Sequence, residues 1–351
     1  MIRIIRCAAV LLGLVTAAPS ANAWDRSDAD VLTVLPNTAS GQPSSVEGLT
    51  VGPDGNIYVP TFGFNATGAL SGNATLYVLK PDGKVLRQVT IANSSPHMLG
   101  LRFNPVNGFL LVLDFGAGKV LHVDPVTGAS SVFMTPTIGG SGLNALTFDK
   151  LGNAYISDSF NGIIWKVGPN GGTPTIWSNS PLLGPGTGLT PPFGANGVEF
   201  SNDGKTLFVA NTAFHQIIQI PVNGDGSAGT ASVFITGINA PDGIAIDRDG
   251  NIWICANQED DIVVIDKTGK VIAKLGDFNG FNKDGVARGL LFPASLAFSL
   301  DRKTLYVSNL TLFLPFAGAL AAVDSAWTLK AKHFTVSAIP AVIPPLNPDR
   351  D

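Results

Sequence analysis

The chain has 351 residues, of which 45% are hydrophobic and 14% are charged, so it has enough apolar residues for a large core and is not a disordered protein. Its formal net charge is −4 and it contains no run of basic residues, which excludes nucleic acid as an expected partner. Short apolar runs alternate with clusters of Gly, Pro, Asn and Asp, a pattern that favours strands and turns over long helices.

The N-terminus has the pattern of a secretory signal peptide. Arg3 and Arg6 precede the apolar run 7–18, and the small-x-small triplet Ala21-Asn22-Ala23 is typical of a cleavage site. We therefore predict that residues 1–23 are a cleaved signal peptide and that the mature protein is secreted or periplasmic. No later stretch is long and apolar enough for a bilayer, so no membrane span is expected.

The rest of the chain repeats one pattern six times. Each copy has a starting residue, an alternating apolar triplet, a turn and a second apolar run. The copies are EGLTVGPDGNIYV from Glu47, LGLRFNPVNGFLLV from Leu99, NALTFDKLGNAYIS from Asn144, NGVEFSNDGKTLFV from Asn196, DGIAIDRDGNIWIC from Asp242 and ASLAFSLDRKTLYV from Ala294. They begin 52, 45, 52, 46 and 52 residues apart, a period that favours a β-propeller over a solenoid.

Two further strands follow in each repeat, for example GIIWKVG and TPTIWS in the third copy. We therefore predict an all-β, six-bladed β-propeller over residues 24–337, with four-stranded antiparallel blades around a central channel. Closing the ring hides sheet edges that would otherwise aggregate. The segment ADVLTVLP at 29–36 is expected to pair with the last blade, and residues 338–351 to form a Pro-rich C-terminal tail.

The first strand of a propeller blade lies innermost, so the residue that starts each repeat is expected at the channel mouth. Four of these six residues carry a side-chain oxygen. Two carboxylates that face each other there would repel and would be costly to desolvate. A divalent cation would relieve this, and the predicted metal ligands are Glu47, Asn144, Asn196 and Asp242.

The ligand chemistry favours Ca²⁺. Oxygen-only ligands suit a hard cation, and Ca²⁺ tolerates amide oxygens and irregular geometry. Mg²⁺ would require stricter octahedral order and Zn²⁺ would normally bring His or Cys, although another divalent cation remains an alternative. A purely structural interpretation also stays open, because Asp and Asn before a strand often hydrogen-bond the neighbouring backbone.

A second polar register ends the second strand of each repeat, 14 or 15 residues after the start. An antiparallel strand ends on the side where its partner begins, so these residues are expected near the first set. They could orient metal ligands or cap loop backbone, and the second role is favoured for most of them. They are Thr61, Asp114, Asp158, Asn211, Asn257 and Asn309.

These segments resemble the SMP-30/gluconolactonase/LRE-like family and its wider six-bladed, calcium-dependent relatives, which include the paraoxonases and Drp35-type lactonases. The motifs that carry the resemblance are VEGLTV, ANGVEFSNDGKTLFVANT and PDGIAIDRDGNIWI, and it covers essentially the whole mature chain. The resemblance implies that the metal-binding Glu, Asn and Asp of the family fall on Glu47, Asn196 and Asp242. It also implies that Asn144 contacts substrate or metal.

Two positions depart from the family pattern. Sugar lactonases carry an Arg two residues before the third-blade Asn, where this chain has Gly142, so the resemblance does not predict recognition of a sugar acid. Paraoxonase-like members carry a His at the second-blade start, which here is Leu99. His97 lies two residues earlier and could reach the mouth from its loop.

We therefore expect an exported, Ca²⁺-dependent hydrolase of lactones or related esters, with the ion at the channel mouth polarising the carbonyl. Either Asp242 or His97 would be the catalytic base, and an ordinary loop role for His97 stays open. The inserts TFGFNATGALSGNATLY and SNSPLLGPGTGLTPPFGA are rich in apolar residues and Pro, which predicts a small-molecule substrate with apolar character. The remaining histidines, His215 among them, are expected to pack or to face solvent.

Two other classes of function stay open. One is a non-catalytic exported propeller that binds a small ligand, a glycan or a protein, with Ca²⁺ as a structural ion. The missing Arg near Asn144 and the shifted His favour it. The other is a lyase or strictosidine-synthase-like activity, for which no matched acid is found. The sequence does not determine the substrate, the number of ions or the oligomeric state.

Overall fold

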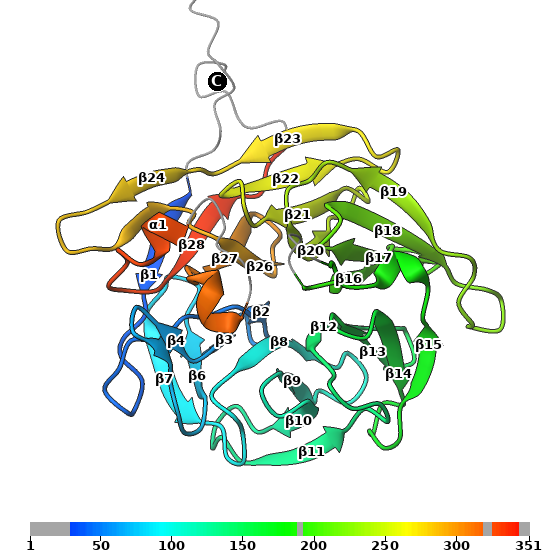
Figure 1. The fold of residues 1–351 in the computed structure, drawn as a ribbon, viewed down its shortest axis with the longest axis horizontal. Coiled ribbons are helices and arrows are strands. Elements are labelled where there is room, and N and C mark those ends of the chain that lie inside the picture. Colours follow the sequence, from blue (N-terminus) through cyan, green and yellow to red (C-terminus); the bar gives the residue numbers. More distant parts are fainter. Residues whose placement is uncertain (1–28, 188–191, 319–324, 344–351) are drawn as a thin grey trace, which may run out of the picture.

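The computed structural model describes residues 29–187, 192–318 and 325–343, and the predicted signal peptide lies outside them. Within these residues the chain forms six four-stranded antiparallel sheets, arranged as the blades of a propeller around a central channel (Figure 1). The predicted six-bladed architecture is thus confirmed.

Blades 1 to 5 follow the chain, and each is ordered from its innermost to its outermost strand. Blade 1 contains β2 (Thr50–Val51), β3 (Ile57–Pro60), β6 (Thr75–Leu79) and β7 (Val85–Thr90). Blade 2 contains β8 (Met98–Phe103), β9 (Leu110–Asp114), β10 (Lys119–Val123) and β11 (Ser130–Met134). Blade 3 contains β12 (Leu143–Phe148), β13 (Ala154–Asp158), β14 (Ile163–Val167) and β15 (Thr175–Ser178). Blade 4 contains β16 (Ala195–Phe200), β17 (Thr206–Asn211), β18 (Gln216–Pro221) and β19 (Ser232–Thr236). Blade 5 contains β20 (Pro241–Ile246), β21 (Ile252–Ala256), β22 (Asp261–Ile265) and β23 (Val271–Leu275).

Blade 6 joins the two ends of the chain. It contains β26 (Pro293–Phe298), β27 (Thr304–Asn309), β28 (Thr335–Pro340) and, outermost, β1 (Asp30–Val34). β1 pairs antiparallel with β28, with Asp30 opposite Ala338 and Val34 opposite Thr335. This confirms the prediction that segment 29–36 fastens the ring. β28 ends at Pro340, so strand pairing continues into the first residues of segment 338–351.

Short elements connect the blade strands. The hairpin of β4 (Phe64–Asn65) and β5 (Gly68–Ala69) follows β3, and that of β24 (Phe278–Phe281) and β25 (Ala287–Gly289) follows β23. The helical turns are η1 (Pro181–Leu183), η2 (Leu314–Ala317) and α1 (Ser325–Thr328). Of the helices that the structure describes, none has the length and apolar character needed to cross a membrane.

The core lies between neighbouring blades. Trp165 of blade 3 is fully buried in a cluster with Leu113 of blade 2, and Trp253 of blade 5 packs in a cluster with Leu296 of blade 6. Large apolar side chains in these layers exclude water on both faces of each sheet, which stabilises the ring by the hydrophobic effect. The innermost strands are therefore held in fixed positions around the channel.

Candidate functional site

The residue that starts each repeat lies at a break in the pairing of the innermost strand. The register shifts by one between the first two strands of blades 2 to 6, in the segment that contains the starting residue. In blade 1, Glu47 lies between the bridge from Val46 to Thr61 and the pairs that begin at Thr50. Such a bulge bends a strand and redirects its side chains. The bulges thus place the starting residues at the channel mouth.

Glycine after the starting residue lets neighbouring blades approach closely. A Cβ on Gly100 would lie 2.7 Å from the carbonyl oxygen of Asn144, and one on Gly243 would lie 2.6 Å from that of Ala294. A Cβ on Gly48 or Gly197 would likewise meet the carbonyl oxygen of the residue that starts the next blade, Leu99 or Asp242. The Glu-Gly, Asn-Gly and Asp-Gly pairs in the repeats therefore have a packing reason, because any side chain at these positions would push the blades apart.

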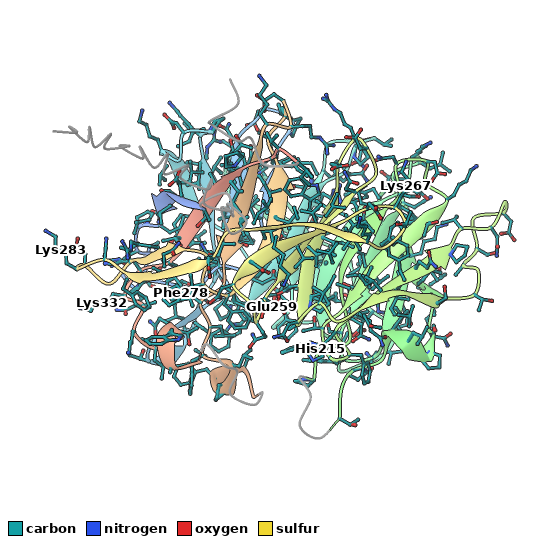
Figure 2. All side chains as sticks on the ribbon, turned by 90° about the horizontal axis from the view of Figure 1, so that it is seen from above. His215, Glu259, Lys267, Phe278, Lys283 and Lys332 are labelled. Atoms are coloured by element: carbon teal, nitrogen blue, oxygen red, sulfur yellow. The ribbon has the colours of Figure 1, made fainter. Side chains whose placement is uncertain are left out.

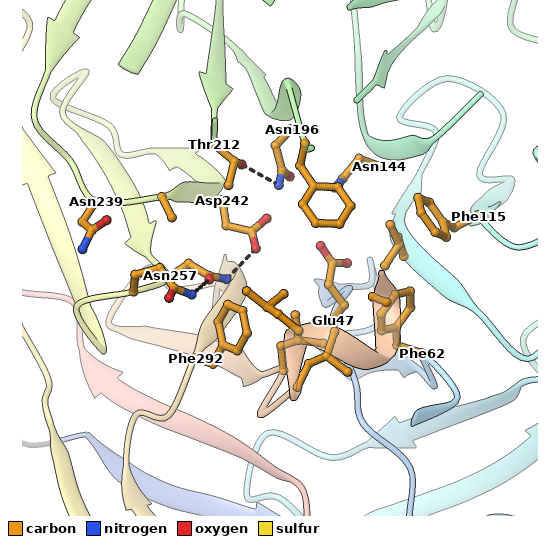
Figure 3. Close-up of a pocket in the computed structure, with 18 of the residues that line it drawn as sticks. Glu47, Phe62, Phe115, Asn144, Asn196, Thr212, Asn239, Asp242, Asn257 and Phe292 are labelled. Carbon is orange, nitrogen blue, oxygen red and sulfur yellow. Dashed lines mark hydrogen bonds between the residues drawn. The ribbon is translucent and has the colours of Figure 1, made fainter. Parts of the chain in front are cut away.

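The four predicted metal ligands line one cavity of about 280 Å³, and Figure 3 shows the carboxylates of Glu47 and Asp242 turned toward the same space. All four side chains are buried. One oxygen of each has no hydrogen-bond partner in the protein, namely Glu47 Oε2, Asn144 Oδ1, Asn196 Oδ1 and Asp242 Oδ1. A buried polar atom without a partner costs about 1–3 kcal/mol. Four such oxygens in one cavity mark a place built to bind a ligand.

Both carboxyl groups are perturbed by their surroundings. Burial raises the pKa of Glu47 well above its ordinary value, and the negative charge of Asp242 raises it further. Burial also raises the pKa of Asp242 to about 8, although the amides of Asn196 and Asn257 act in the opposite direction. The two carboxylates therefore resist being charged together unless a cation lies between them.

The residues fit a hard divalent cation. Among the described residues there is no cluster of three or more His, Cys, Asp or Glu side chains suited to a metal. The candidate set instead combines two carboxylates with two carboxamides, so all its donors are oxygen. Ca²⁺ accepts mixed carboxylate and amide oxygens with irregular geometry, and is the ion that this set suits best.

Two of the predicted ligands, Asp242 and Asn196, are held in place by hydrogen bonds to neighbouring polar side chains. Asn257 Nδ2 donates to Asp242 Oδ2 at 2.8 Å, and Asn257 Oδ1 accepts from Gln258 Nε2 at 2.8 Å. Asn196 Nδ2 donates to Thr212 Oγ1 at 3.0 Å, and Thr212 Oγ1 donates to the carbonyl of Pro241 at 2.8 Å. These contacts fix Asp242 and Asn196 with one oxygen of each left without a partner. Thr212 was not predicted, although it directly follows Asn211 of the second register.

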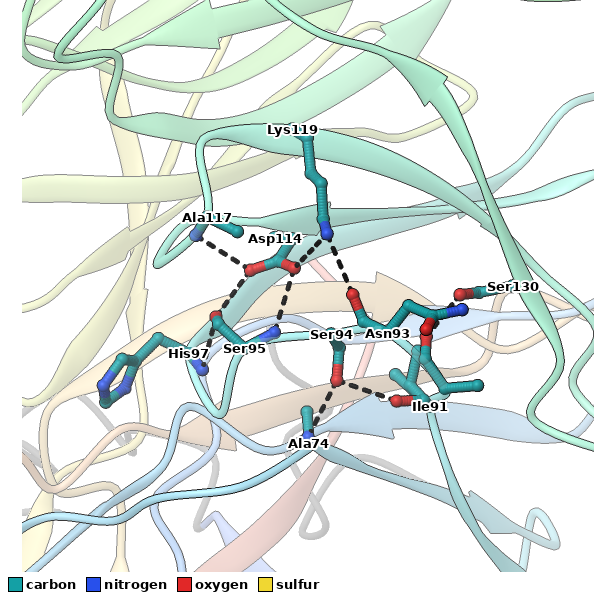
Figure 4. A network of polar contacts seen from close by, with 11 residues as sticks. Ala74, Ile91, Asn93, Ser94, Ser95, His97, Asp114, Ala117, Lys119 and Ser130 are labelled. Atoms are coloured by element: carbon teal, nitrogen blue, oxygen red, sulfur yellow. Dashed lines mark hydrogen bonds and ion pairs between the residues drawn. The ribbon is translucent and has the colours of Figure 1, made fainter.

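The other residues of the second register hydrogen-bond the backbone of strands and loops, which is the role that the sequence favoured for most of them. Asp114 is an example (Figure 4), because its Oδ1 accepts from Ser95 Oγ at 2.5 Å and Ala117 N at 3.1 Å, and its Oδ2 accepts from Ser95 N at 3.0 Å. Asp158 and Asn309 accept hydrogen bonds from the backbone amides of Gly142 and Leu291. Asn211 donates to the carbonyl of Leu182, and Thr61 accepts from the amide of Thr75.

His97, the second predicted base, does not line the cavity. Its Nδ1 lies 2.7 Å from the carbonyl oxygen of Phe62, and its ring stacks on Phe64 with 4.6 Å between the ring centroids. The side chain of Phe62 lines the cavity and meets His97 edge to face. The structure therefore brings Asp242 into the cavity and places His97 against an aromatic residue of its wall.

The walls of the cavity are largely apolar. They include aromatic residues from the loops of blades 1, 2, 4 and 6 and residues of the apolar segment 310–317, which precedes α1 and was not predicted to line the site. These residues are Phe62, Leu99, Phe115, Phe193, Phe292, Leu310, Leu312, Leu314 and Ala317. Phe160 extends the aromatic wall, since its ring contacts those of Phe115 and Phe193 at centroid distances of 5.5 and 5.8 Å.

A smaller part of the wall is polar and includes, besides the predicted ligands and the Thr212 and Asn257 side chains that hold them, Asn239, His215 and Gln258. Figure 3 shows Asn239 and Phe115 on opposite sides of the cavity. His215 packs in the fold as expected, since it is half-buried and its Nδ1 accepts from Ala240 N, but it also lines the cavity, which was not predicted. Its place in the turn after β17, at the same end as the second register, is the signal that could have identified it.

The packing around Gly142 explains why this position does not carry the Arg of the sugar lactonases. A Cβ at this position would lie 2.7 Å from the ring of Phe160. The space that a side chain at 142 would need is therefore filled by an aromatic ring that belongs to the apolar wall.

The fold and this site define a six-bladed propeller with an oxygen-lined, aromatic-walled cavity at the channel mouth. Residues 191–276 match the family model described as SMP-30/Gluconolactonase/LRE-like region, which confirms the predicted resemblance. Lactonase drp35 of Staphylococcus haemolyticus is 28% identical to this chain over 139 residues, which are 38% of this chain. The match spans 41% of the length of that relative.

Solved structures share the fold over most of the chain. Regucalcin, a calcium-binding protein from Agrobacterium tumefaciens, superposes with a TM-score of 0.61 and 19% identity, over 89% of this chain and 93% of that one. A luciferin-regenerating enzyme gives a TM-score of 0.60 with 16% identity, over 88% of this chain and 96% of that one. Streptogramin B lyase superposes with a TM-score of 0.58 and 14% identity, over 91% of this chain and 99% of that one. The fold alone therefore does not determine the reaction.

Proposed function

We propose that this protein is an exported, Ca²⁺-dependent hydrolase of lactones or related esters with apolar character. The observation that carries the proposal is the set of four buried oxygens without protein partners in one cavity. The match to the SMP-30/gluconolactonase/LRE-like model and the partial match to a lactonase support the reaction class. The calcium binding of regucalcin supports the choice of ion.

Glu47, Asn144, Asn196 and Asp242 would hold the cation, which when bound supplies Lewis-acid polarisation of an ester carbonyl. Asp242 is the better placed of the two predicted bases, because it lines the cavity and Asn257 holds only its Oδ2. It would take a proton from a water molecule whose oxygen adds to the carbonyl carbon. The ring C–O bond then breaks, and the ring oxygen leaves as an alcohol after gaining a proton. Asn144 would contact the substrate as well as the ion.

The walls support an apolar substrate. A ring or chain of carbon atoms would bury apolar surface against Phe62, Phe115 and Phe193, at a gain of about 25 cal/mol per Å². A sugar acid would instead bury hydroxyl groups against these rings without partners, which is unfavourable. Aliphatic and aromatic lactones are therefore the proposed substrates.

Metal analysis and a lactone panel test this proposal. We expect the purified protein to bind Ca²⁺ and to hydrolyse aliphatic or aromatic lactones better than sugar lactones, with activity lost in EDTA and restored by Ca²⁺. Full activity after removal of the metal would contradict the mechanism. Bound Ca²⁺ without turnover would favour the non-catalytic binding protein. A product that takes up no ¹⁸O from labelled water would favour a lyase.

Export is proposed from the predicted signal peptide alone. N-terminal sequencing of the protein from a periplasmic or culture fraction of the native host tests it, and we expect the mature chain to begin at Trp24. A mature chain that retains residues 1–23 would contradict the proposal.

A further inference from the structure

His215 lies on the lower face of the molecule in the view of Figure 2 and lines the polar side of the cavity. Only one of its ring nitrogens is available to a bound molecule, because the backbone occupies the other. Its Nδ1 accepts a hydrogen bond of 2.9 Å from the backbone amide of Ala240. A backbone N–H can only donate, so Nδ1 must carry a lone pair, and the proton of the neutral imidazole is on Nε2. The structure gives Nε2 no acceptor among the described residues.

The backbone holds this arrangement in place. His215 and Ala240 have φ values of 56° and 48°, in the left-handed region that residues with side chains seldom adopt. Such conformations persist where the surrounding structure enforces them, and they concentrate at functional sites. The carbonyl of Ala240 accepts from Asn257 N at 3.2 Å, and the side chain of Asn257 holds Asp242. His215 is thus anchored to the segment that supplies a predicted metal ligand.

We propose that His215 donates a hydrogen bond from Nε2 to an ester oxygen of the bound substrate and is neither the acid nor the base of the reaction. This inference rests on the proposed function. Adding a proton at Nδ1 would bring two N–H donors face to face at Ala240, and Nε2 already carries its proton. His215 can therefore only donate. His215 contacts Ala240, the neighbour of Asn239, and Asn239 lies across the cavity from Phe115 (Figure 3). The ester group of the substrate would therefore face His215 and its apolar part would face Phe115.

Variants of His215 test the donor role. His215→Gln can keep both contacts, because its amide oxygen can accept from Ala240 and its NH₂ can donate to substrate. His215→Phe removes both. The loss of a donor that stabilises developing charge lowers kcat by about 100- to 1,000-fold. We expect a loss of this size for His215→Phe, a loss of no more than about tenfold for His215→Gln by the same reasoning, and unchanged Ca²⁺ affinity in both.

His122→Phe is the matched control. Its ring stacks on Phe109 at 3.9 Å between centroids in blade 2, and it does not line the cavity. It should keep full turnover. The pH profile of kcat should have the same shape in wild type and His215→Gln, because the proposed role involves no proton transfer. A limb of the profile that disappears in His215→Gln would identify His215 as an acid or base and overturn the inference.

Two measurements separate this inference from the proposed function. Calorimetry would follow the binding of a phenyl-substituted six-membered lactam to the Ca²⁺-loaded protein, and ¹⁵N long-range NMR would report the tautomer of His215. We expect the Nε2–H form at pH 7 and lactam binding at least about tenfold weaker in His215→Phe, the cost of one lost hydrogen bond.

The outcomes distinguish failure of the proposed function from failure of the donor role of His215. If wild type binds the lactam but hydrolyses no lactone, the proposed function fails, and weaker binding by His215→Phe still supports the donor. Equal lactam binding by wild type and His215→Phe overturns the inference, as does an Nδ1–H tautomer. If wild type neither binds the lactam nor hydrolyses lactones, both proposals fail. Should His215→Phe not fold, the tautomer of the wild-type protein and the His215→Gln profile decide.

Discussion

The central channel opens into a cavity at each end, and the two cavities are built from opposite ends of the same innermost strands. The cavity at the starting residues has a volume of about 280 Å³. The cavity at the other end is larger, about 440 Å³, and its lining includes Arg102, Glu199 and Arg302. Both ends carry charged side chains, so neither size nor charge alone separates them.

The difference lies in how the polar groups are paired. At the larger cavity, Arg102 Nη1 donates to Glu199 Oε2 at 2.5 Å and to Thr147 Oγ1 at 3.1 Å, while Thr147 Oγ1 donates to Glu199 Oε1 at 3.0 Å. None of the described side chains that line this cavity has a buried N or O atom without a partner. The smaller cavity contains four such oxygens. Unpaired buried atoms, and not cavity size, thus distinguish the end that requires a ligand.

Removing a carboxylate from the smaller cavity should have the largest effect. We expect Asp242→Ala to lower kcat/KM for the best lactone by at least about 1,000-fold, because it removes a proposed calcium ligand and the proposed base together. Calcium binding, measured by calorimetry, should be lost as well. Glu199→Gln at the other end is the control and should keep both. A fully active Asp242→Ala variant would show that the unpaired oxygens are not the site.

Asn257 and Asn309 occupy equivalent positions in blades 5 and 6, but only Asn257 contacts Asp242. We expect Asn257→Ala to weaken calcium binding by about 10- to 100-fold, as the loss of a residue that orients a ligand does. Asn309→Ala should leave the calcium affinity unchanged and lower the free energy of unfolding by about 1–3 kcal/mol. Calcium titration and urea unfolding of both variants check this. Equal calcium affinities would contradict the orienting role of Asn257.

The calcium affinity should depend on pH. In the metal-free protein burial raises the pKa of Asp242 to about 8, so Asp242 holds a proton at pH 6. Burial and the charge of Asp242 also raise the pKa of Glu47, so Glu47 gives up its proton less readily than a free carboxyl group does. Calcium must displace those protons, and its Kd should therefore fall as pH rises from 6 to 8, by up to about tenfold per unit for each proton released. Calorimetry in buffers of different ionisation enthalpy measures both quantities. A Kd that does not change over this range would contradict the raised pKa values.

The smallest effect is expected at the larger cavity. The side chain of Arg102 is 39% exposed, so solvent screens its ion pair with Glu199. We expect Arg102→Gln to lower the free energy of unfolding by at most about 1 kcal/mol and to leave calcium binding and turnover unchanged. Thermal unfolding and the lactone assay test this. Reduced turnover in this variant would show that the two ends of the channel are coupled.

The positions predicted from the sequence agree with the structure where the repeat governs them. Glu47, Asn144, Asn196 and Asp242 occupy one register, and a fixed register in a closed ring brings its members to one place. His97 and His215 lie in loops, whose course the repeat does not determine. His97 is only two residues from a starting residue, yet its Nδ1 meets the carbonyl of Phe62 outside the cavity lining. His215 reaches the cavity from the turn after β17.

The sequence by itself determined the six-bladed architecture, the closing strand and the oxygen-bearing residues at the mouth, because these follow from periodicity and residue type. Only the tertiary structure decided which of their oxygens lack partners, that Phe160 fills the space beside Gly142, and that Nδ1 of His215 is taken by Ala240. The physical reason is that hydrogen bonding and packing are settled between segments far apart in the chain. Thr212 and Asn257 hydrogen-bond Asn196 Nδ2 and Asp242 Oδ2, so the other polar atom of each of these two side chains stays available to a ligand.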